Sequence, residues 1–366
     1  MLEKKIIIFM PSIEGGGVEK NLFIICNYLS KKYKKLSIIT VSNQYKPYFS
    51  NKIKFLGPKN KFWIHFGRLS KYIICSFYLI TELVKKNNKN LVFSFQGNLF
   101  AILISKILNT KIITRANAAP SGWILNPVKK IFFKFVYSFS DLVIVNSNSF
   151  KKEFKKYFNL NSTCIYNPLD KNKIIKLSRE KNNYFKKSAR VLKIINIGRL
   201  VDQKNQLLLL KALSDLNQKI DFKLLIIGNG ILKNKLLQFI KESNIKNKVK
   251  IINFQKNPYK FLDKSDLLIH TAKFEGLPNV LIEAQVLKKF IISSDCPTGP
   301  KEILCNGKAG FLFKNGDYKQ LSKKIMLFTK SKRIVSNKIN YGYKKIDRFD
   351  YYYSLNKYYS EIKRII

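Results

Sequence analysis

Residues 192–205 read LKIINIGRLVDQKN, an apolar run that ends in glycine and leads into a helix-length segment. A strand made almost entirely of apolar residues is buried on both faces, as in a parallel sheet that helices cover. The same pattern of apolar run and helix-length segment continues toward both ends of the chain. It predicts an α/β fold of the doubly wound type.

The apolar runs form two sets. In the first half the predicted strands are IIIFM (6–10), LSIIT (36–40), LVFSF (91–95), KIITR (111–115), LVIVN (142–146) and CIYN (164–167). In the second half they are LKIINIG (192–198), FKLLIIG (222–228), VKIINF (249–254), DLLIH (266–270), FIISS (290–294) and GFLF (310–313). A polar, lysine-rich stretch lies between the sets. We therefore expect two Rossmann-like domains, 1–168 and 191–344, with a linker region at 169–190.

The composition is strongly basic. The 366 residues include 69 Lys+Arg against 22 Asp+Glu, a net charge of +47, and 46% of them are hydrophobic. Such a high apolar content excludes a disordered polycation. The charge is spread over both halves, which argues against a detachable nucleic-acid-binding arm. An AT-rich genome is an alternative source of the lysines, but a surface this positive attracts phosphate groups in either case.

Cysteine and histidine usage restricts the chemistry further. The five cysteines are scattered singly, and the two histidines are His65 and His270, so we expect no zinc cluster and no bound metal. An odd number of cysteines fits a reducing compartment, which predicts a cytoplasmic location. No apolar stretch reaches the roughly 20 residues of a membrane span. The N-terminal apolar run lacks a small-residue cleavage site and is better explained as a strand than as a signal peptide.

Ligands of open α/β sheets gather beyond the carboxyl ends of the strands, and five such places stand out. Gly15, Gly16 and Gly17 follow the first strand and open a helix, where backbone amides can approach a phosphate or sugar; a plain turn is the alternative. After strand 192–198, Arg199 and Lys204 lie five residues apart and can converge on a diphosphate. The segment 228–230, GNG, is either a strand-to-helix turn or a ligand-facing loop.

The remaining two places follow strands 266–270 and 290–294. In FEGLPNVLIEA (274–284), Pro278 suits a first helical position, so Glu275 lies in the loop and Glu283 on the helix. Their carboxylates can accept hydrogen bonds from sugar or ribose hydroxyls; a cap or an ion pair is the alternative. In SSDCPTGPKEIL (293–304), prolines and a glycine fix the backbone and present Thr298 and nearby amides to a ligand. Cys296 has no histidine near it and is not expected to be a nucleophile.

At these residues the sequence resembles a family 4 glycosyltransferase. The matching elements are GGGVEK, GRLVDQKN, EGLPNVLIE and SSDCPTGPKEIL, which occur in the order typical of that family. The resemblance implies the GT-B fold, in which two Rossmann-like domains face a cleft. It also implies retaining transfer of a sugar from a nucleotide-sugar donor without a metal or other cofactor. The loop DCPTGPKEIL further resembles members that build bacterial surface glycans on lipid carriers, several of which use uridine diphosphate sugars.

The resemblance implies roles for individual residues. Arg199 and Lys204 would bind the donor diphosphate and stabilise the leaving group, Glu275 would hold hydroxyls of the donor sugar, and these three are the predicted catalytic residues. Arg115 and Thr298 are candidate donor or acceptor contacts; Arg115 stands where many relatives have a histidine. The predicted donor-binding residues are Gly16, Gly17, Gly198, Gly276, Leu277, Pro278, Asn279, Val280 and Glu283, the last on the ribose.

The same resemblance explains the aromatic C-terminal segment. Residues 345–366 would form a crossover helix that packs back on the first domain. The expected function is transfer of a UDP-hexose or UDP-N-acetylhexosamine sugar to a lipid-linked glycan or lipopolysaccharide in surface polysaccharide synthesis. Aromatic and basic residues interleave in 62–78 and 128–137, which predicts docking on the anionic inner face of the plasma membrane, unless these segments are ordinary buried helices.

Two other functions compete with this interpretation. A GT-B-fold sugar-nucleotide epimerase would need acid/base carboxylates or histidines, which fits the motifs less well. A nucleic-acid-binding protein would suit the high pI, but the sequence has no recognisable binding motif, and Glu275 and Glu283 would repel a phosphate backbone. We therefore expect no nucleic-acid partner.

Overall fold

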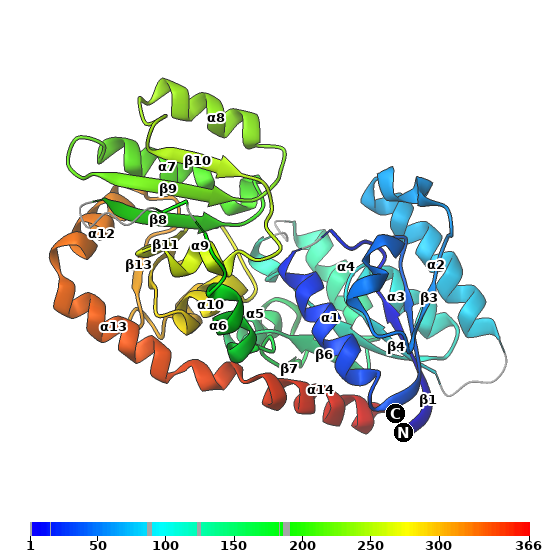
Figure 1. Ribbon diagram of the computed structural model, residues 1–366. Coiled ribbons are helices and arrows are strands. Elements are labelled where there is room, and N and C mark those ends of the chain that lie inside the picture. The colour runs from blue at the N-terminus through cyan, green and yellow to red at the C-terminus, as the bar shows by residue number, and fades with distance from the viewer. Residues whose placement is uncertain (1, 15, 86–89, 123–125, 183, 186–190) are drawn as a thin grey trace. The chain divides into compact units, whose positions relative to one another are not determined.

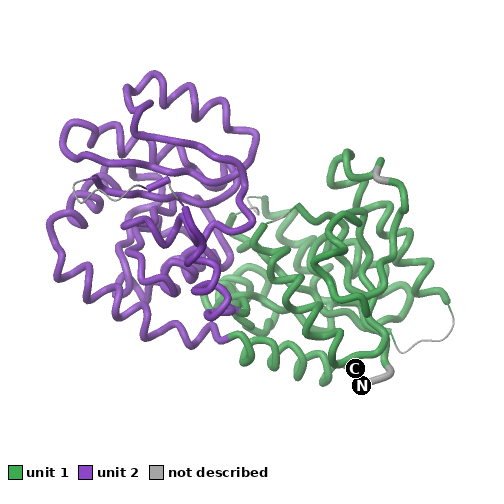
Figure 2. The backbone as a smooth tube through the Cα atoms, in the orientation of Figure 1, with its two compact units in different colours: residues 1–168, 351–366 green, residues 169–350 purple. Residues whose placement is uncertain are grey.

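The computed structural model describes residues 2–14, 16–85, 90–122, 126–182, 184–185 and 191–366. It divides into two compact units (Figure 2). The first unit comprises Met1–Pro168 and Tyr351–Ile366, and the second comprises Leu169–Asp350. Within the described residues, no helix has the length and apolar character needed to cross a membrane.

The first unit contains a parallel sheet in the order β3-β2-β1-β4-β5-β6-β7 (Figure 1). Its strands are β1 (Leu2–Phe9), β2 (Tyr33–Ile39), β3 (Ile53–Leu56), β4 (Asn90–Ser94), β5 (Lys111–Arg115), β6 (Leu142–Val145) and β7 (Thr163–Cys164). Its helices are α1 (Gly17–Leu29), α2 (Arg68–Val84), α3 (Asn98–Ile107), α4 (Pro127–Tyr137), α5 (Asn148–Phe158) and α14 (Tyr351–Ile365).

Alternate residues of β1 show why its sequence is apolar without interruption. Ile6 and Ile8 pack in one core with residues of α1 and α14, whereas Ile7 and Phe9 pack in a second core with residues of α2, α3, α4 and α5. Side chains of a strand point alternately to the two faces of a sheet. Because helices cover both faces, every position of the strand must be apolar.

The second unit is built in the same way. Its sheet has the order β10-β9-β8-β11-β12-β13. The strands are β8 (Leu192–Ile197), β9 (Phe222–Ile227), β10 (Val249–Ile252), β11 (Leu267–His270), β12 (Phe290–Ser294) and β13 (Phe311–Phe313). The helices are α6 (Lys171–Ser178), α7 (Gln206–Asp215), α8 (Lys233–Glu242), α9 (Tyr259–Asp263), α10 (Asn279–Val286), α11 (Gly299–Ile303), α12 (Tyr318–Lys330) and α13 (Lys332–Lys344).

Both sheets reverse their strand order at one point. In the second sheet the chain runs outward from β8 to β10 and then returns to the other side of β8, where it forms β11. Strands β8 and β11 pair only at Leu267 and Leu268. Beyond this pairing the side chain of Asn196 donates a hydrogen bond to the carbonyl oxygen of Ile269, at 2.8 Å. Such a reversal opens a crevice at the carboxyl ends of the two strands, where ligands of doubly wound sheets bind.

Each of the twelve predicted strands overlaps an observed one, and the prediction of a doubly wound α/β fold is correct. Strand β3 was not predicted; it is a four-residue edge strand. The predicted linker region 169–190 contains helix α6, which packs against α9 and α10 in the second unit. Residues 183 and 186–190 of that region lie outside the described residues.

The C-terminal segment divides between the units. Residues 346–349 form a 3-10 turn of the second unit, and α14 packs against α1 of the first. The amide of Leu169 donates a hydrogen bond to the carbonyl of Phe349 at 3.2 Å, and Leu169 pairs with Asp350 as an isolated parallel bridge. The chain therefore enters and leaves the second unit through two adjacent segments.

Candidate active site

The strand reversal of the second sheet brings two predicted site residues together. Lys204 ends the short 3-10 turn that follows β8, and Glu275 lies in the loop that follows β11. The ammonium of Lys204 forms an ion pair and hydrogen bond with Oε1 of Glu275. The two side chains are only 20% and 10% exposed, so the ion pair is largely shielded from solvent.

A third residue, His270, completes this cluster. It is the last residue of β11 and is 4% exposed. Its Nε2 lies 3.0 Å from Oε1 of Glu275, and its Nδ1 lies 3.1 Å from Oγ of Ser293 on β12. From the sequence, His270 was considered only as a metal ligand, and its place in this cluster was not predicted. Its position at the carboxyl end of a strand, the criterion applied to the other residues, would have identified it.

The cluster sets the protonation of its members. Burial alone would raise the pKa of Glu275, but the charge of Lys204 and the hydrogen bond with His270 outweigh it and lower the pKa to about 2. Burial lowers the pKa of His270 below its ordinary 6.5, although Glu275 acts in the opposite direction. At neutral pH the carboxylate is therefore ionised and the imidazole is neutral.

Two glycines shape the loop between β8 and Lys204. A Cβ on Gly228 would lie 1.9 Å from the carbonyl oxygen of Gly198, and a Cβ on Gly230 would lie 2.2 Å from that of Leu200. The GNG segment is therefore glycine-rich because the backbone at 198–200 packs directly against it. This contact gives the segment a structural role and fixes the path of the chain toward Lys204.

Arg199 lies apart from the cluster. Its side chain is exposed and forms no hydrogen bond or ion pair with any residue that the structure describes. Its carbonyl oxygen accepts a hydrogen bond from the side chain of Gln206 at 3.0 Å. The structure thus brings Lys204 and Glu275 together but does not bring the guanidinium of Arg199 onto them.

The loop from Glu275 leads into α10. Gly276, Leu277 and Pro278 are buried, whereas Asn279 and Val280 are half-buried. The helix begins at Asn279, with Pro278 as its N-cap rather than its first residue. Pro278 has an extended backbone (φ −70°, ψ 104°) and therefore lies outside the helix.

Glu283 lies on α10, as predicted, and is buried. Its Oε1 accepts a hydrogen bond from the hydroxyl of Tyr259 on α9, at 3.2 Å.

Thr298 supports this loop from the N-cap of α11, beyond β12. It is 7% exposed, and its Oγ1 lies 3.2 Å from the carbonyl oxygen of Glu275 and 3.0 Å from that of Gly276. The predicted ligand contact through this hydroxyl does not fit these bonds, because the hydroxyl is turned toward the loop. Burial, with a smaller contribution from Glu275, raises the pKa of the neighbouring Cys296 thiol to about 12, so this thiol stays protonated.

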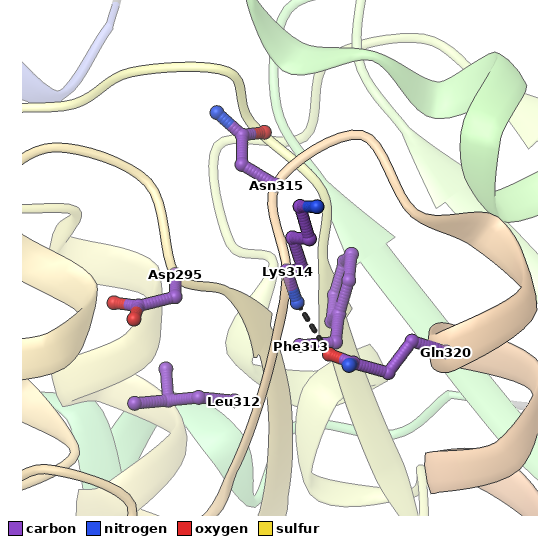
Figure 3. Close-up of a pocket in the computed structure, with 6 residues that line it drawn as sticks. All are labelled: Asp295, Leu312, Phe313, Lys314, Asn315 and Gln320. Carbon is purple, nitrogen blue, oxygen red and sulfur yellow. Dashed lines mark hydrogen bonds between the residues drawn. The ribbon is translucent and has the colours of Figure 1, made fainter.

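A pocket of about 450 Å³ lies at the same edge of the sheet, beyond β12 and β13 (Figure 3). It is lined by Asp295, Leu312, Phe313, Lys314, Asn315 and Gln320. Asn315 connects it to the loop before Glu275, because its side chain donates to the carbonyl of Lys273 at 2.8 Å. Neither Lys204, Glu275 nor His270 lines this pocket, so we assign the chemistry to the charged cluster and not to this pocket.

The first unit carries its own candidate residues. Gly16 is the N-cap of α1, and its amide donates to Oε2 of Glu19 at 2.9 Å. The buried carboxylate of Glu19 thus occupies an amide that the sequence analysis assigned to phosphate or sugar. Gly17 begins the helix and is exposed, and Gly15 lies outside the described residues.

Arg115, at the end of β5, is 1% exposed. It donates from Nε to the hydroxyl of Tyr358 on α14 at 2.9 Å, from Nη2 to Oδ1 of Asn167 at 2.6 Å, and from Nη1 to Oδ1 of Asn117. A surface contact with donor or acceptor does not fit this burial. The guanidinium instead joins β5 to the segment just before Leu169 and to the helix that begins at Tyr351.

Comparisons with known proteins show which family and which structures this chain resembles. Residues 175–345 match the family model described as glycosyl transferases group 1. An uncharacterised glycosyltransferase, MJ1059 of Methanocaldococcus jannaschii, is 34% identical to this chain over 250 residues. The matched region is 62% of this chain and 61% of that relative's length. The N-acetylgalactosamine-N,N'-diacetylbacillosaminyl-diphospho-undecaprenol 4-alpha-N-acetylgalactosaminyltransferase of Campylobacter jejuni is 28% identical over 84% of the chain and 86% of its own length.

Similarity to a solved structure establishes the fold. Anabaena Alr3699/HepE in complex with UDP and glucose superposes with a TM-score of 0.79 at 16% identity, over 99% of this chain and all of that one. The protein therefore has the GT-B fold. The part of its second unit that carries Lys204, His270 and Glu275 matches the glycosyl transferases group 1 family.

Proposed function

We propose that the protein transfers a sugar from a nucleotide-sugar donor to a lipid-linked glycan or lipopolysaccharide in bacterial surface polysaccharide synthesis, with retention of the anomeric configuration. The observation that carries the proposal is the Lys204–Glu275–His270 cluster, which lies where the sheet of the second unit reverses its strand order. The names of relatives support the substrates: the Campylobacter jejuni relative acts on a diphospho-undecaprenol-linked glycan, and another from Erwinia amylovora serves amylovoran biosynthesis.

The cluster suits the charges of this reaction. The bond between C1 of the sugar and the diphosphate oxygen breaks, a bond from C1 to the acceptor oxygen forms, and the acceptor proton passes to the departing phosphate. Negative charge develops on the diphosphate, where the ammonium of Lys204 and the exposed guanidinium of Arg199 stabilise it. Glu275 accepts hydrogen bonds from the donor sugar and Glu283 from the ribose. These cations take the place of a metal ion in the proposal.

The donor we propose is a UDP-hexose or UDP-N-acetylhexosamine. The name of the Campylobacter jejuni relative specifies transfer of N-acetylgalactosamine, and the similar Anabaena structure contains UDP and glucose. An ionised carboxylate such as that of Glu275 is an acceptor for the hydroxyls that all these sugars share.

Turnover of a panel of nucleotide sugars with a polyprenyl-diphosphate-linked acceptor tests the proposal. Lys204→Met and Glu275→Gln should each lower kcat/KM about 10²- to 10³-fold, as expected when one group that stabilises a transition state is removed. Lys273→Met is the matched control, because Lys273 also pairs with a carboxylate, that of Asp202, but in an exposed position. Full activity in both site variants, or equal loss in the control, contradicts the assignment.

The same proposal includes peripheral attachment to the inner face of the plasma membrane. Exposed apolar residues line one face of α2 at helical spacing and continue on α3 and α4. Helix α3 packs against α2, and α4 packs against α3. The exposed apolar residues are Leu69, Ile73, Phe77, Ile80 and Val84 on α2, Leu103 and Ile107 on α3, and Val128, Ile131, Phe132 and Phe135 on α4. Exposed lysines 129, 130 and 134 of α4 lie among them. Such a surface suits an anionic bilayer, where each cation contributes about 1 kcal/mol.

Co-sedimentation with vesicles of anionic lipid tests the attachment. Ile73→Asp and Phe77→Asp together should abolish binding, whereas Ile231→Asp, at an apolar residue that is 89% exposed in the second unit, should leave binding intact. Binding by the wild type should weaken as salt is added, because the lysine contribution is screened. An absence of vesicle binding by the wild type refutes this part of the proposal.

A further inference from the structure

His270 is a buried titratable residue whose two ring nitrogens both have partners. Nε2 lies against Oε1 of Glu275 and Nδ1 against Oγ of Ser293. The proposed reaction assigns no step to it, and its ring is buried with both nitrogens in hydrogen-bonding contact. Its contacts therefore point to a role that acts through Glu275.

The chemistry of the partners determines the tautomer of the ring. An ionised carboxylate can only accept hydrogen bonds, so Nε2 must carry the proton that it shares with Glu275. In the neutral ring Nδ1 is then an acceptor, and the hydroxyl of Ser293 donates to it. Ser293 on β12 thus holds the ring on β11 in the tautomer that Glu275 requires.

The two oxygens of Glu275 are used unequally. Both the ammonium of Lys204 and Nε2 of His270 bind Oε1. No hydrogen bond from the part of the chain that the structure describes reaches Oε2. A carboxylate held at one oxygen from two directions cannot rotate freely, and the other oxygen keeps one orientation.

We propose that His270 is a positioning residue, which, together with Lys204, fixes Glu275 so that Oε2 is the acceptor for one hydroxyl of the donor sugar. The inference rests on the proposed function, since it assigns Glu275 to the sugar. Under this assignment the imidazole of His270 contributes to recognition of the donor sugar and not to recognition of the nucleotide. A positioning error of this kind lowers turnover by about 10- to 100-fold.

Two substitutions separate positioning from packing. His270→Gln keeps an N–H donor near the place of Nε2, whereas His270→Leu keeps an apolar side chain of similar reach and removes the donor. His270→Leu should lose about 10- to 100-fold in kcat/KM for the nucleotide sugar and bind the free nucleoside diphosphate within about twofold of wild type. His270→Gln should recover most of the loss. Thermal unfolding of each variant shows whether it is folded.

Calorimetry gives a readout that does not require turnover. The ratio of affinities for the nucleotide sugar and for the nucleoside diphosphate should fall in His270→Leu and return in His270→Gln. Wild-type protein that binds nucleotide sugars but transfers none would refute the proposed function and leave this test intact. If folded His270→Leu keeps the wild-type ratio, or if His270→Gln restores nothing, the positioning role is refuted.

The tautomer can be observed directly, because the chain has only two histidines. In protein with ¹⁵N-labelled histidine rings, His65→Gln removes the signals of the exposed ring and assigns those of His270. We expect a neutral ring protonated at Nε2 at neutral pH. A ring protonated at Nδ1 alone would break the hydrogen bond on which the inference depends and would overturn it.

Discussion

Replacing Lys204 with methionine should destabilise the second unit, and the loss should be smaller when the Glu275 carboxylate is already neutral. The pKa of Glu275 falls from 4.5 to about 2, which corresponds to about 3 kcal/mol in favour of the ionised form in the folded state. His270 still donates to the carboxylate in Lys204→Met, so we assign about 2 kcal/mol to the lysine. For a unit of this size that lowers the melting temperature by about 4–8 °C.

A double-mutant cycle measures this dependence. Denaturant unfolding at pH 7 of wild type, Lys204→Met, Glu275→Gln and the double variant should give a coupling free energy of about 1–2 kcal/mol, because loss of the lysine matters less once the carboxylate is neutral. The same cycle at the exposed pair of Lys273 and Asp202 should give less than about 0.5 kcal/mol. Effects at Lys204 and Glu275 that add within about 0.5 kcal/mol would refute the buried ion pair.

Four further predictions concern stability and cofactor dependence. Because the folded pKa of Glu275 lies below its ordinary value of 4.5, its stabilisation is complete above that value and is lost as the pH falls toward about 2; urea unfolding across this range should show a flatter pH dependence in Glu275→Gln. Gly228→Ala should cost about 3 kcal/mol or more, because its Cβ would lie 1.9 Å from the carbonyl of Gly198, whereas Gly67→Ala, which has open space, should be nearly neutral in thermal unfolding. Arg115→Met should destabilise the first unit by about 3 kcal/mol in denaturant unfolding without changing nucleoside diphosphate affinity, because it leaves the partners of a buried guanidinium unpaired. Dialysis against EDTA should leave sugar transfer unchanged, and recovery of lost activity by a divalent cation would contradict the metal-free proposal.

The strands were predictable because helices cover both faces of each sheet. A strand such as β1 must then be apolar at every position, and that pattern can be read without knowledge of its neighbours. Strand β3 lies at the edge, where Lys54 is exposed, so it lacks the continuous apolar run. Helix α6 was missed because it is short and rich in lysine, and its stability comes from packing against α9 and α10.

Part of the site was predictable for a different reason. Lys204 and Glu275 were identified because each follows a predicted strand. The strand order that brings the two side chains together was not predicted. His270 satisfied the same criterion, but its partner on β12 was not evident from the pattern. The surroundings of Arg115 depend on Asn167 and Tyr358, which are distant in sequence, and no local pattern could have revealed that they bury it.

The discontinuous first unit has a consequence for synthesis of the chain. Leu355, Tyr358 and Ile362 of the 15-residue helix α14 belong to the same core as β1 and α1, and Tyr358 also binds Arg115. During translation α14 leaves the ribosome only after all of the second unit has been made. The second unit can therefore fold while the first, although synthesised earlier, still exposes one face of its sheet to solvent and to chaperones. Completion of the first unit therefore waits for synthesis of the second.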